Sequence, residues 1–194
     1  MKRIALTTAA LIALSGCSLG LTQKPPPFLL NLVPTVSPMA NDGQAVTADS
    51  AMVIAVPVVP QAIATGRVPV AQGNTAIAYI KDAMWVEPPA RLFQRLLSET
   101  VRVKTGRAVL DARQAVSGAG LLTGQLLHFE IDESSNKAVV VYDATWNAGG
   151  KRGVLNRRFE ARVPVGKIAP QEAGQALNRA ANQVAGEVAV WVSK

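Results

Sequence analysis

The chain has 194 residues, of which 49% are hydrophobic, and it carries a formal net charge of +7. A chain of this length and apolar content can bury one good core, so we expect a single domain after processing. Only 5% of the residues are aromatic, and they are not interleaved with basic residues as base-stacking surfaces require. Nucleic acid is therefore not an expected partner.

Residues 1–16 have the pattern of an export signal. Lys2 and Arg3 form a positive start, and residues 4–14 are an uncharged apolar run. This run is too short to cross a bilayer as a helix, which needs about 20 apolar residues, so we expect it to be removed. Without Lys2 and Arg3 the formal charge is about +5, which suits a domain that faces anionic lipid or an acidic protein.

Cys17 is the only cysteine and directly follows this run. The tetrad LSGC resembles the lipobox of bacterial lipoproteins, in which the cysteine thiol and then the new α-amino group are acylated. The alternatives are a plain signal peptide with an incidental cysteine, or a short buried helix. Acylation would leave no cysteine for a disulfide, so packing alone would hold the fold. By resemblance to known sorting rules, Ser18 favours delivery to the outer membrane.

Residues 17–27 are predicted to be a tether, because they are small and polar and end in a stiff run of three prolines. Pro57 cannot donate a ladder hydrogen bond, so its strand should lie at a sheet edge or carry a bulge. Residues 35–50 have no apolar period and are predicted to be a loop. The first strand candidates are residues 28–33, 52–59, 68–70 and 75–80.

An amphipathic helix is predicted after Trp85. Pro88 and Pro89 suit its first turn, and Gly106 supplies a C-cap. Two roles for Trp85 remain open, a hydrophobic lid on the helix and a contact for a partner. The apolar stripe of this helix consists of Leu92, Phe93, Leu96, Leu97, Thr100 and Val101.

The second half of the chain is predicted to be an antiparallel meander followed by a helix. Strands are expected from Leu121 through Ile131, then at 138–146 and 154–165, with turns at 134–136 and 147–153. Residues 109–112 are ambiguous. In the first strand, Leu127, Phe129 and Ile131 should form the buried face. On the third strand, Arg157, Arg158 and Arg162 should be exposed. Pro170 opens the helix, whose apolar stripe is Ala173, Leu177, Ala180, Val184, Val188 and Trp191.

These elements predict an α+β fold, with one mixed and mostly antiparallel sheet packed by two main helices. Its partly unpaired edges make self-association plausible.

Catalytic chemistry has little support in the sequence. His128, Glu130 and Asp132 should share one face of a strand and form a conceivable metal site, but a solvated polar face is the favoured interpretation because a stable site needs further ligands. No serine lies in a G-x-S-x-G turn. Residues 149–153 contain glycine and lysine but lack the spacing of a phosphate-binding loop. We therefore expect a protein that is not an enzyme.

Several stretches together resemble one family. They include MVIAVPVVP, RVPV, LLTGQLLHFEID, AVVVYDATW, RRFEARVPV and ALNRAANQVAGEVAVWV, and the strongest is IAYIKDAMWVEPPARLFQRLLSETV. These motifs are structural, and the pattern is similar to that of the ABC-type transport auxiliary lipoproteins. The resemblance spans nearly all of the mature chain and places the family domain at residues 28–194.

The resemblance implies a lipoprotein on the periplasmic face of the outer membrane. Its implied partners are a protein with a mammalian-cell-entry domain, an inner-membrane permease and an ATPase, which together move phospholipid or related lipids between the two membranes. No cofactor is expected beyond the covalent lipid on Cys17. The candidate partner contacts are Arg67, Tyr79, Trp85, Arg157 and Arg158.

Two other functions remain open at this point. One is a lipoprotein that regulates another envelope machine, such as a peptidoglycan synthase. The other is a lipid carrier that holds acyl chains in a pocket of its own.

Overall fold

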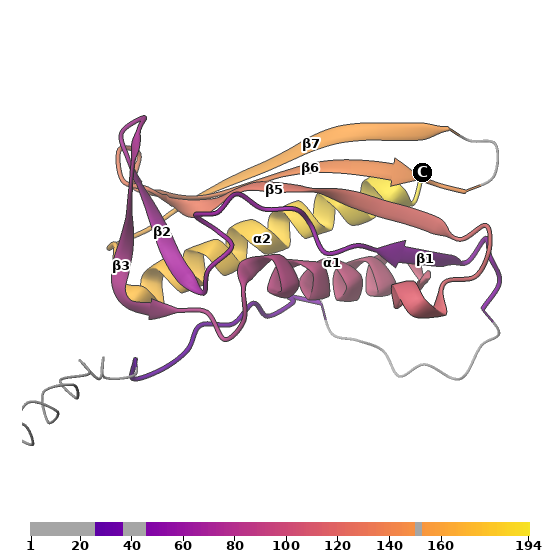
Figure 1. Ribbon diagram of the computed structural model, residues 1–194, viewed down its shortest axis with the longest axis horizontal. Coiled ribbons are helices and arrows are strands. Elements are labelled where there is room, and N and C mark those ends of the chain that lie inside the picture. The colour runs from indigo at the N-terminus through magenta and orange to yellow at the C-terminus, as the bar shows by residue number, and fades with distance from the viewer. Residues whose placement is uncertain (1–25, 37–45, 150–152) are drawn as a thin grey trace, which may run out of the picture.

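The computed structural model describes residues 26–36, 46–149 and 153–194. The predicted signal, Cys17 and the tether up to residue 25 lie outside this part, as do pieces of the predicted loop at 35–50 and of the turn at 147–153. Within it, one mixed sheet of seven strands carries two helices on one face, so the single α+β domain is confirmed (Figure 1).

The long strand β5 is the centre of the sheet. β6 pairs with one edge of β5 in antiparallel orientation, and β7 follows β6 in the same way. On the other edge of β5, β1 and β2 pair parallel to its beginning and its end. β4 adds parallel to β1, and β3 adds antiparallel to β2. The strands are β1 (Ala51–Ile54), β2 (Arg67–Gln72), β3 (Ala76–Met84), β4 (Ala108–Leu110), β5 (Gly120–Asp132), β6 (Lys137–Asn147) and β7 (Val154–Pro164).

The predicted meander is confirmed, with one error of register. β5 has an irregularity between Leu126 and His128, opposite Tyr142 and Val141 of β6. Such a bulge changes which residues face the core. Leu126 is consequently fully buried, whereas the predicted Leu127 is only half-buried. From Phe129 onward the predicted alternation holds.

Both predicted helices are present. α1 (Pro89–Thr105) begins with proline at its first position and ends at Gly106, whose φ of 69° is the left-handed value that favours glycine. Its predicted apolar stripe is buried. α2 (Pro170–Val192) packs on β6, β7 and α1. Its alanines let it approach the sheet closely, and Trp191 at its end packs edge-on against Phe159, with ring centroids 5.5 Å apart.

The strand predicted at residues 52–59 is shorter than expected, and the ambiguous stretch at 109–112 is resolved. β1 ends at Ile54 instead of residue 59, and it lies between β4 and β5, inside the sheet. Pro57 lies beyond its end, and the chain then touches β5 again only at Val58, through a bridge to Gln125. The ambiguous stretch at 109–112 divides into β4 and a short 3₁₀ helix, Ala112–Gln114.

Residues 28–33 do not form the predicted strand. Their one ladder contact is a bridge between Leu30 and Trp85. This segment instead crosses the helices on the side away from the sheet, as Figure 1 shows for the indigo part of the chain. Leu30 and Leu32 are buried in the common core. Because both helix faces are thereby covered, the core extends from the sheet through the helices to this segment.

Candidate functional surfaces

Residues 28–35, here called the N-terminal strap, connect the predicted tether to the folded domain. Two asparagines of α2 hold the strap by hydrogen bonds. The Val33 N–H donates to Asn178 Oδ1 at 2.8 Å, and the Thr35 N–H donates to Asn182 Oδ1 at 2.8 Å. The Asn182 side chain also donates to the Val33 carbonyl at 2.9 Å. The strap therefore fixes the side of the domain on which the tether enters.

The sequence did not predict these hydrogen bonds between α2 and the strap. A signal was present, because Asn178 and Asn182 are polar residues one turn apart within an alanine-rich helix. The partner of these asparagines lies about 145 residues away in the chain, at Val33. No local pattern could have identified it.

Trp85, a candidate partner contact, is a core residue. Its side chain is 3% exposed and its ring lies 5.4 Å from that of Phe129. The backbone of Trp85 donates to the Gly66 carbonyl at 2.7 Å. Because so little of this side chain reaches the surface, the prediction of a partner contact at Trp85 does not fit the structure, and the alternative of a packing residue does.

Arg67 and Tyr79 are brought together on the β2–β3 hairpin. The Arg67 guanidinium lies 3.9 Å above the centre of the Tyr79 ring, in cation–π geometry. The Tyr79 hydroxyl donates to the Ala62 carbonyl at 3.4 Å. Tyr79 is half-buried and also lines a concavity of about 360 Å³ between the hairpin and the start of α2. The exposed Arg67 thus remains available as a contact, with Tyr79 as its platform.

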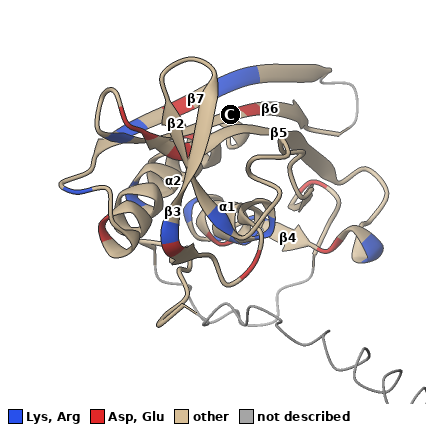
Figure 2. Ribbon diagram, turned by 60° about the vertical axis from the view of Figure 1, so that its left-hand side comes forward, with Lys and Arg blue, Asp and Glu red and all other residues tan. Residues whose placement is uncertain are grey.

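Arg158 lies on the face of the sheet that the helices leave uncovered. Its Nε and Nη2 donate to the two carboxylate oxygens of Asp143, each at 2.6 Å. Figure 2 shows such acidic and basic positions side by side along β6 and β7. The pair borders a polar concavity of about 590 Å³, which is lined by Val58, Thr123, Gly124, Gln125, Asp143, Ala144, Thr145, Asn156, Arg157 and Arg158.

Arg157 has a different environment from its neighbour. Its guanidinium lies 4.9 Å from the centre of the Phe159 ring, which itself packs on Trp191. Among the described residues, β7 pairs with β6 alone, so Arg157 and Arg158 lie on a sheet edge with open backbone groups. The arginines flank this edge with positive charge.

The ion pair of Arg158 and Asp143 predicts a pH dependence of stability. The hydrogen bonds from Arg158 hold the pKa of Asp143 below its usual value of 3.8. Because the folded pKa is lowered, the stabilisation is complete above about pH 5 and is lost as the pH falls through the folded pKa. Asp143→Asn should therefore lower the free energy of unfolding at pH 7 by about 0.2–1 kcal/mol, since the pair is partly exposed.

Urea unfolding of both proteins at several pH values measures this effect. The difference between wild type and Asp143→Asn should shrink as the pH falls below 3.8. A constant difference down to pH 2 would contradict the assignment.

Other polar residues of the outer sheet face and its adjoining turn bind one another. His128 Nδ1 lies 2.7 Å from a carboxylate oxygen of Glu130. Asp132 accepts from the hydroxyls of Ser134 and Ser135, and these bonds lower its pKa to about 2. In the described part of the chain, no group of three or more His, Cys, Asp or Glu residues could hold a metal ion. None of the described helices is long and apolar enough to cross a membrane.

The family model of the ABC-type transport auxiliary lipoprotein component matches residues 29–189, and the chain belongs to this family. The resemblance noted in the sequence is thus confirmed. A comparison with curated proteins finds no match.

Two solved structures share the fold. One is a protein described as uncharacterized, with 14% identity and a TM-score of 0.67, covering 86% of this chain and 97% of its own. The other is a protein from Xanthomonas campestris assigned to the family DUF330, with 19% identity and a TM-score of 0.66, covering 82% of this chain and 92% of its own. At these sequence identities, the two structures show only that this chain shares their fold.

Proposed function

We propose that the chain is an outer-membrane lipoprotein, acylated at Cys17, that acts as the docking component of a lipid-transport system. Its partners would be a mammalian-cell-entry protein with an ABC permease and an ATPase. The observation that carries this proposal is the family match, which begins at residue 29, twelve positions after Cys17. The mature chain is then a short tether followed directly by the family domain.

Several charged residues of the sheet are engaged within the domain. Arg158, Asp143, Glu130 and Asp132 are occupied by hydrogen bonds to neighbouring side chains. ATP hydrolysis is assigned to another subunit, and this chain contributes attachment and binding surfaces.

The packing of the core also favours docking over a carrier of acyl chains. The space between the sheet and the helices is filled by side chains that are fully buried, among them Phe93, Tyr142, Leu177 and Val188. The larger concavity lies on the outer sheet face and has polar walls, including an ion pair. A hydrocarbon chain bound there would leave these polar groups without water.

Crosslinking in cells followed by affinity capture of the full chain tests this function. We expect capture of a mammalian-cell-entry protein together with its permease and ATPase. A Cys17→Ser variant serves as the control, because it should leave the membrane fraction and lose this capture. Recovery of a peptidoglycan synthase or another envelope machine in place of these partners would contradict the proposal.

Mass spectrometry of the purified protein tests the anchor by itself. The mature chain should begin at Cys17 and carry a diacylglyceryl group on the thiol and an acyl group on the α-amine. An unmodified thiol or a retained leader would contradict acylation, whatever partners are captured.

A further inference from the structure

Two short segments lie side by side where the strap enters the domain. The Leu30 N–H donates to the Met84 carbonyl at 2.7 Å, and the Val86 N–H donates to the Leu30 carbonyl at 2.8 Å. The strap and the end of β3 are thereby held in parallel, with Leu30 opposite Trp85. The position of the strap's first residues is therefore fixed by backbone hydrogen bonds as well as by the core.

The side chains of this ribbon alternate between the core and the surface. Leu30 and Trp85 point inward and are 8% and 3% exposed. In extended chains successive side chains point to opposite faces, so their neighbours point outward. Leu29, Met84 and Val86 are consequently exposed, at 53%, 40% and 47%, and Phe28, in the bend before the ribbon, is exposed at 42%. These four large apolar side chains are here called the apolar ridge. Single exposed apolar residues are common on proteins, but a group of them marks an interaction surface.

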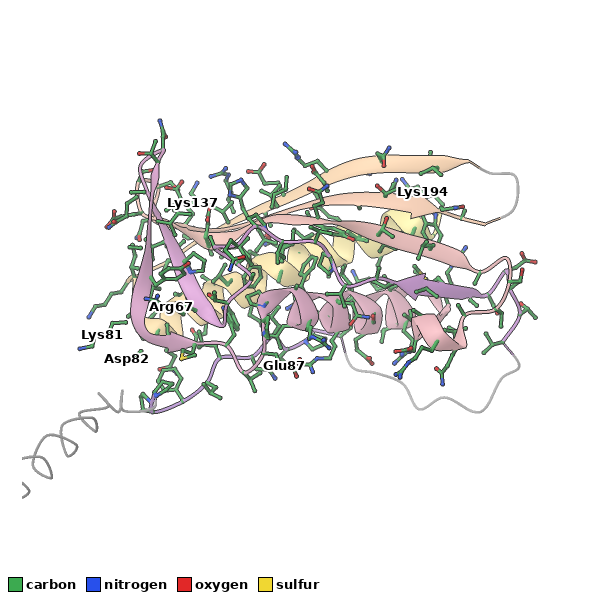
Figure 3. All side chains as sticks on the ribbon, viewed as in Figure 1. Arg67, Lys81, Asp82, Glu87, Lys137 and Lys194 are labelled. Carbon is green, nitrogen blue, oxygen red and sulfur yellow. The ribbon has the colours of Figure 1, made fainter. Side chains whose placement is uncertain are left out.

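Two basic residues and one acidic residue flank the apolar ridge. Arg67 of β2 is the register partner of Met84 on β3, and Lys81 and Asp82 precede Met84 on the same strand. Figure 3 shows Arg67, Lys81 and Asp82 at the end of the molecule where the strap begins. Glu87, which follows the ridge, already binds Arg95 at 2.7 Å. Apolar side chains with cationic neighbours suit the headgroup region of a bilayer that contains anionic lipid.

The length of the chain between the predicted anchor and the ridge favours the bilayer as the occupant. Phe28 follows Cys17 by eleven positions, and a fully extended chain spans about 3.3–3.6 Å per residue. Phe28 and Leu29, the part of the ridge that the strap supplies, therefore lie nearest to the predicted anchor along the chain, within about 40 Å of it.

We propose that the apolar ridge rests on the lipid surface and sets the orientation of the domain on the membrane. This inference rests on the proposed acylation of Cys17. With the ridge on the bilayer, the strap and the helices face the lipid, and the outer face of β5, β6 and β7 points away from it (Figure 1). The polar concavity and the basic edge of β7 are then accessible to a partner that arrives from the periplasm.

Site-specific fluorescence on liposomes tests this orientation. The acylated full chain is reconstituted on vesicles of phosphatidylethanolamine and phosphatidylglycerol, with an environment-sensitive fluorophore on Val86→Cys. The acylated Cys17 does not react with the label. The matched control is the same label on Val154→Cys, because Val154 is also exposed but lies on β7. Doxyl-labelled lipids should quench the label at position 86 at least twofold and leave the label at position 154 unchanged.

A second variant tests the ridge itself. Leu29→Glu in the Val86-labelled protein should reduce the quenching to that of the Val154 control. Thermal unfolding should be unchanged, since the Leu29 side chain is exposed.

Each outcome decides one of the two proposals. Flotation of the protein with equal, weak quenching at both positions contradicts the orientation and leaves the anchor intact. A label at position 86 that is shielded from water but not quenched by lipid shows that a protein surface covers the ridge, which also contradicts it. If the unlabelled chain does not float with the vesicles, the proposed anchor fails, and this inference fails with it.

Discussion

Trp85→Ala is expected to lower the free energy of unfolding by about 3–5 kcal/mol, the range for the loss of a large buried aromatic side chain. The Trp85 ring is 3% exposed and packs 5.4 Å from the Phe129 ring, so its removal leaves a cavity between the strap and the sheet. Urea unfolding measures the effect as a lower midpoint at an unchanged slope. If the Trp85→Ala protein kept wild-type stability but no longer bound a partner, Trp85 would be a partner contact after all.

Two further variants give this prediction its controls. Val86→Ala changes the next residue, whose side chain is 47% exposed, and should alter stability by less than about 0.5 kcal/mol. Trp85→Phe keeps an aromatic ring and removes the indole N–H, which is buried and has no hydrogen-bond partner among the described residues. Because an unpaired buried donor is costly, Trp85→Phe should lose much less stability than Trp85→Ala.

Gly124→Ala should also destabilise the protein strongly, by about 3 kcal/mol, the upper end for an overpacked core. A Cβ at this position would lie 2.3 Å from the backbone oxygen of Asp143 and 2.7 Å from the Tyr142 ring. The Asp143 backbone is held in the ladder between β5 and β6, so it cannot move aside without loss of hydrogen bonds. Thermal unfolding should show a melting temperature lower by about 6–12 °C for a domain of this size.

Gly166→Ala is the matched control for Gly124→Ala. A Cβ at Gly166 meets no atom within 4 Å, and its backbone is not in the left-handed region. This variant should be neutral or slightly stabilising, because alanine reduces the conformational freedom of the unfolded chain. Equal losses at the two glycines would show that Gly124 is not a close contact.

The elements predicted best are those whose pattern is local. The stripe of α1, its prolines and Gly106 predict the helix and both of its ends, because helical spacing and the left-handed C-cap depend only on neighbouring residues. The same holds for α2 and for the meander of β5, β6 and β7, in which consecutive strands pair. The family resemblance rested on these local patterns too.

The elements predicted badly are those that depend on distant partners. Residues 28–33 have the composition of a strand, yet the hydrogen bonds of Asn178 and Asn182 hold the strap on α2. Residues 52–59 form an almost unbroken apolar run, but only its first part forms a ladder with β4 and β5, and Val58 adds a single bridge to β5. A short apolar run does not show which neighbour will cover it.

The candidate site residues divide in the same way. Arg158 was predicted to be exposed on its strand, whereas its bidentate bond to Asp143 follows from the register of β6 with β7. The apolar ridge was not predicted, because Leu29 and Val86 become neighbours only when the strap lies beside β3.

The sequence by itself determined the fold class, the two helices and the family. It also predicts that Cys17 carries lipid. Cys17 lies outside the described residues, and mass spectrometry tests this prediction. The tertiary structure decided that Trp85 is core, that the strap lies on the helices, and that four apolar side chains meet beside it. The physical reason is that periodicity depends on the geometry of the local backbone, whereas burial of a particular side chain depends on which distant segment packs against it.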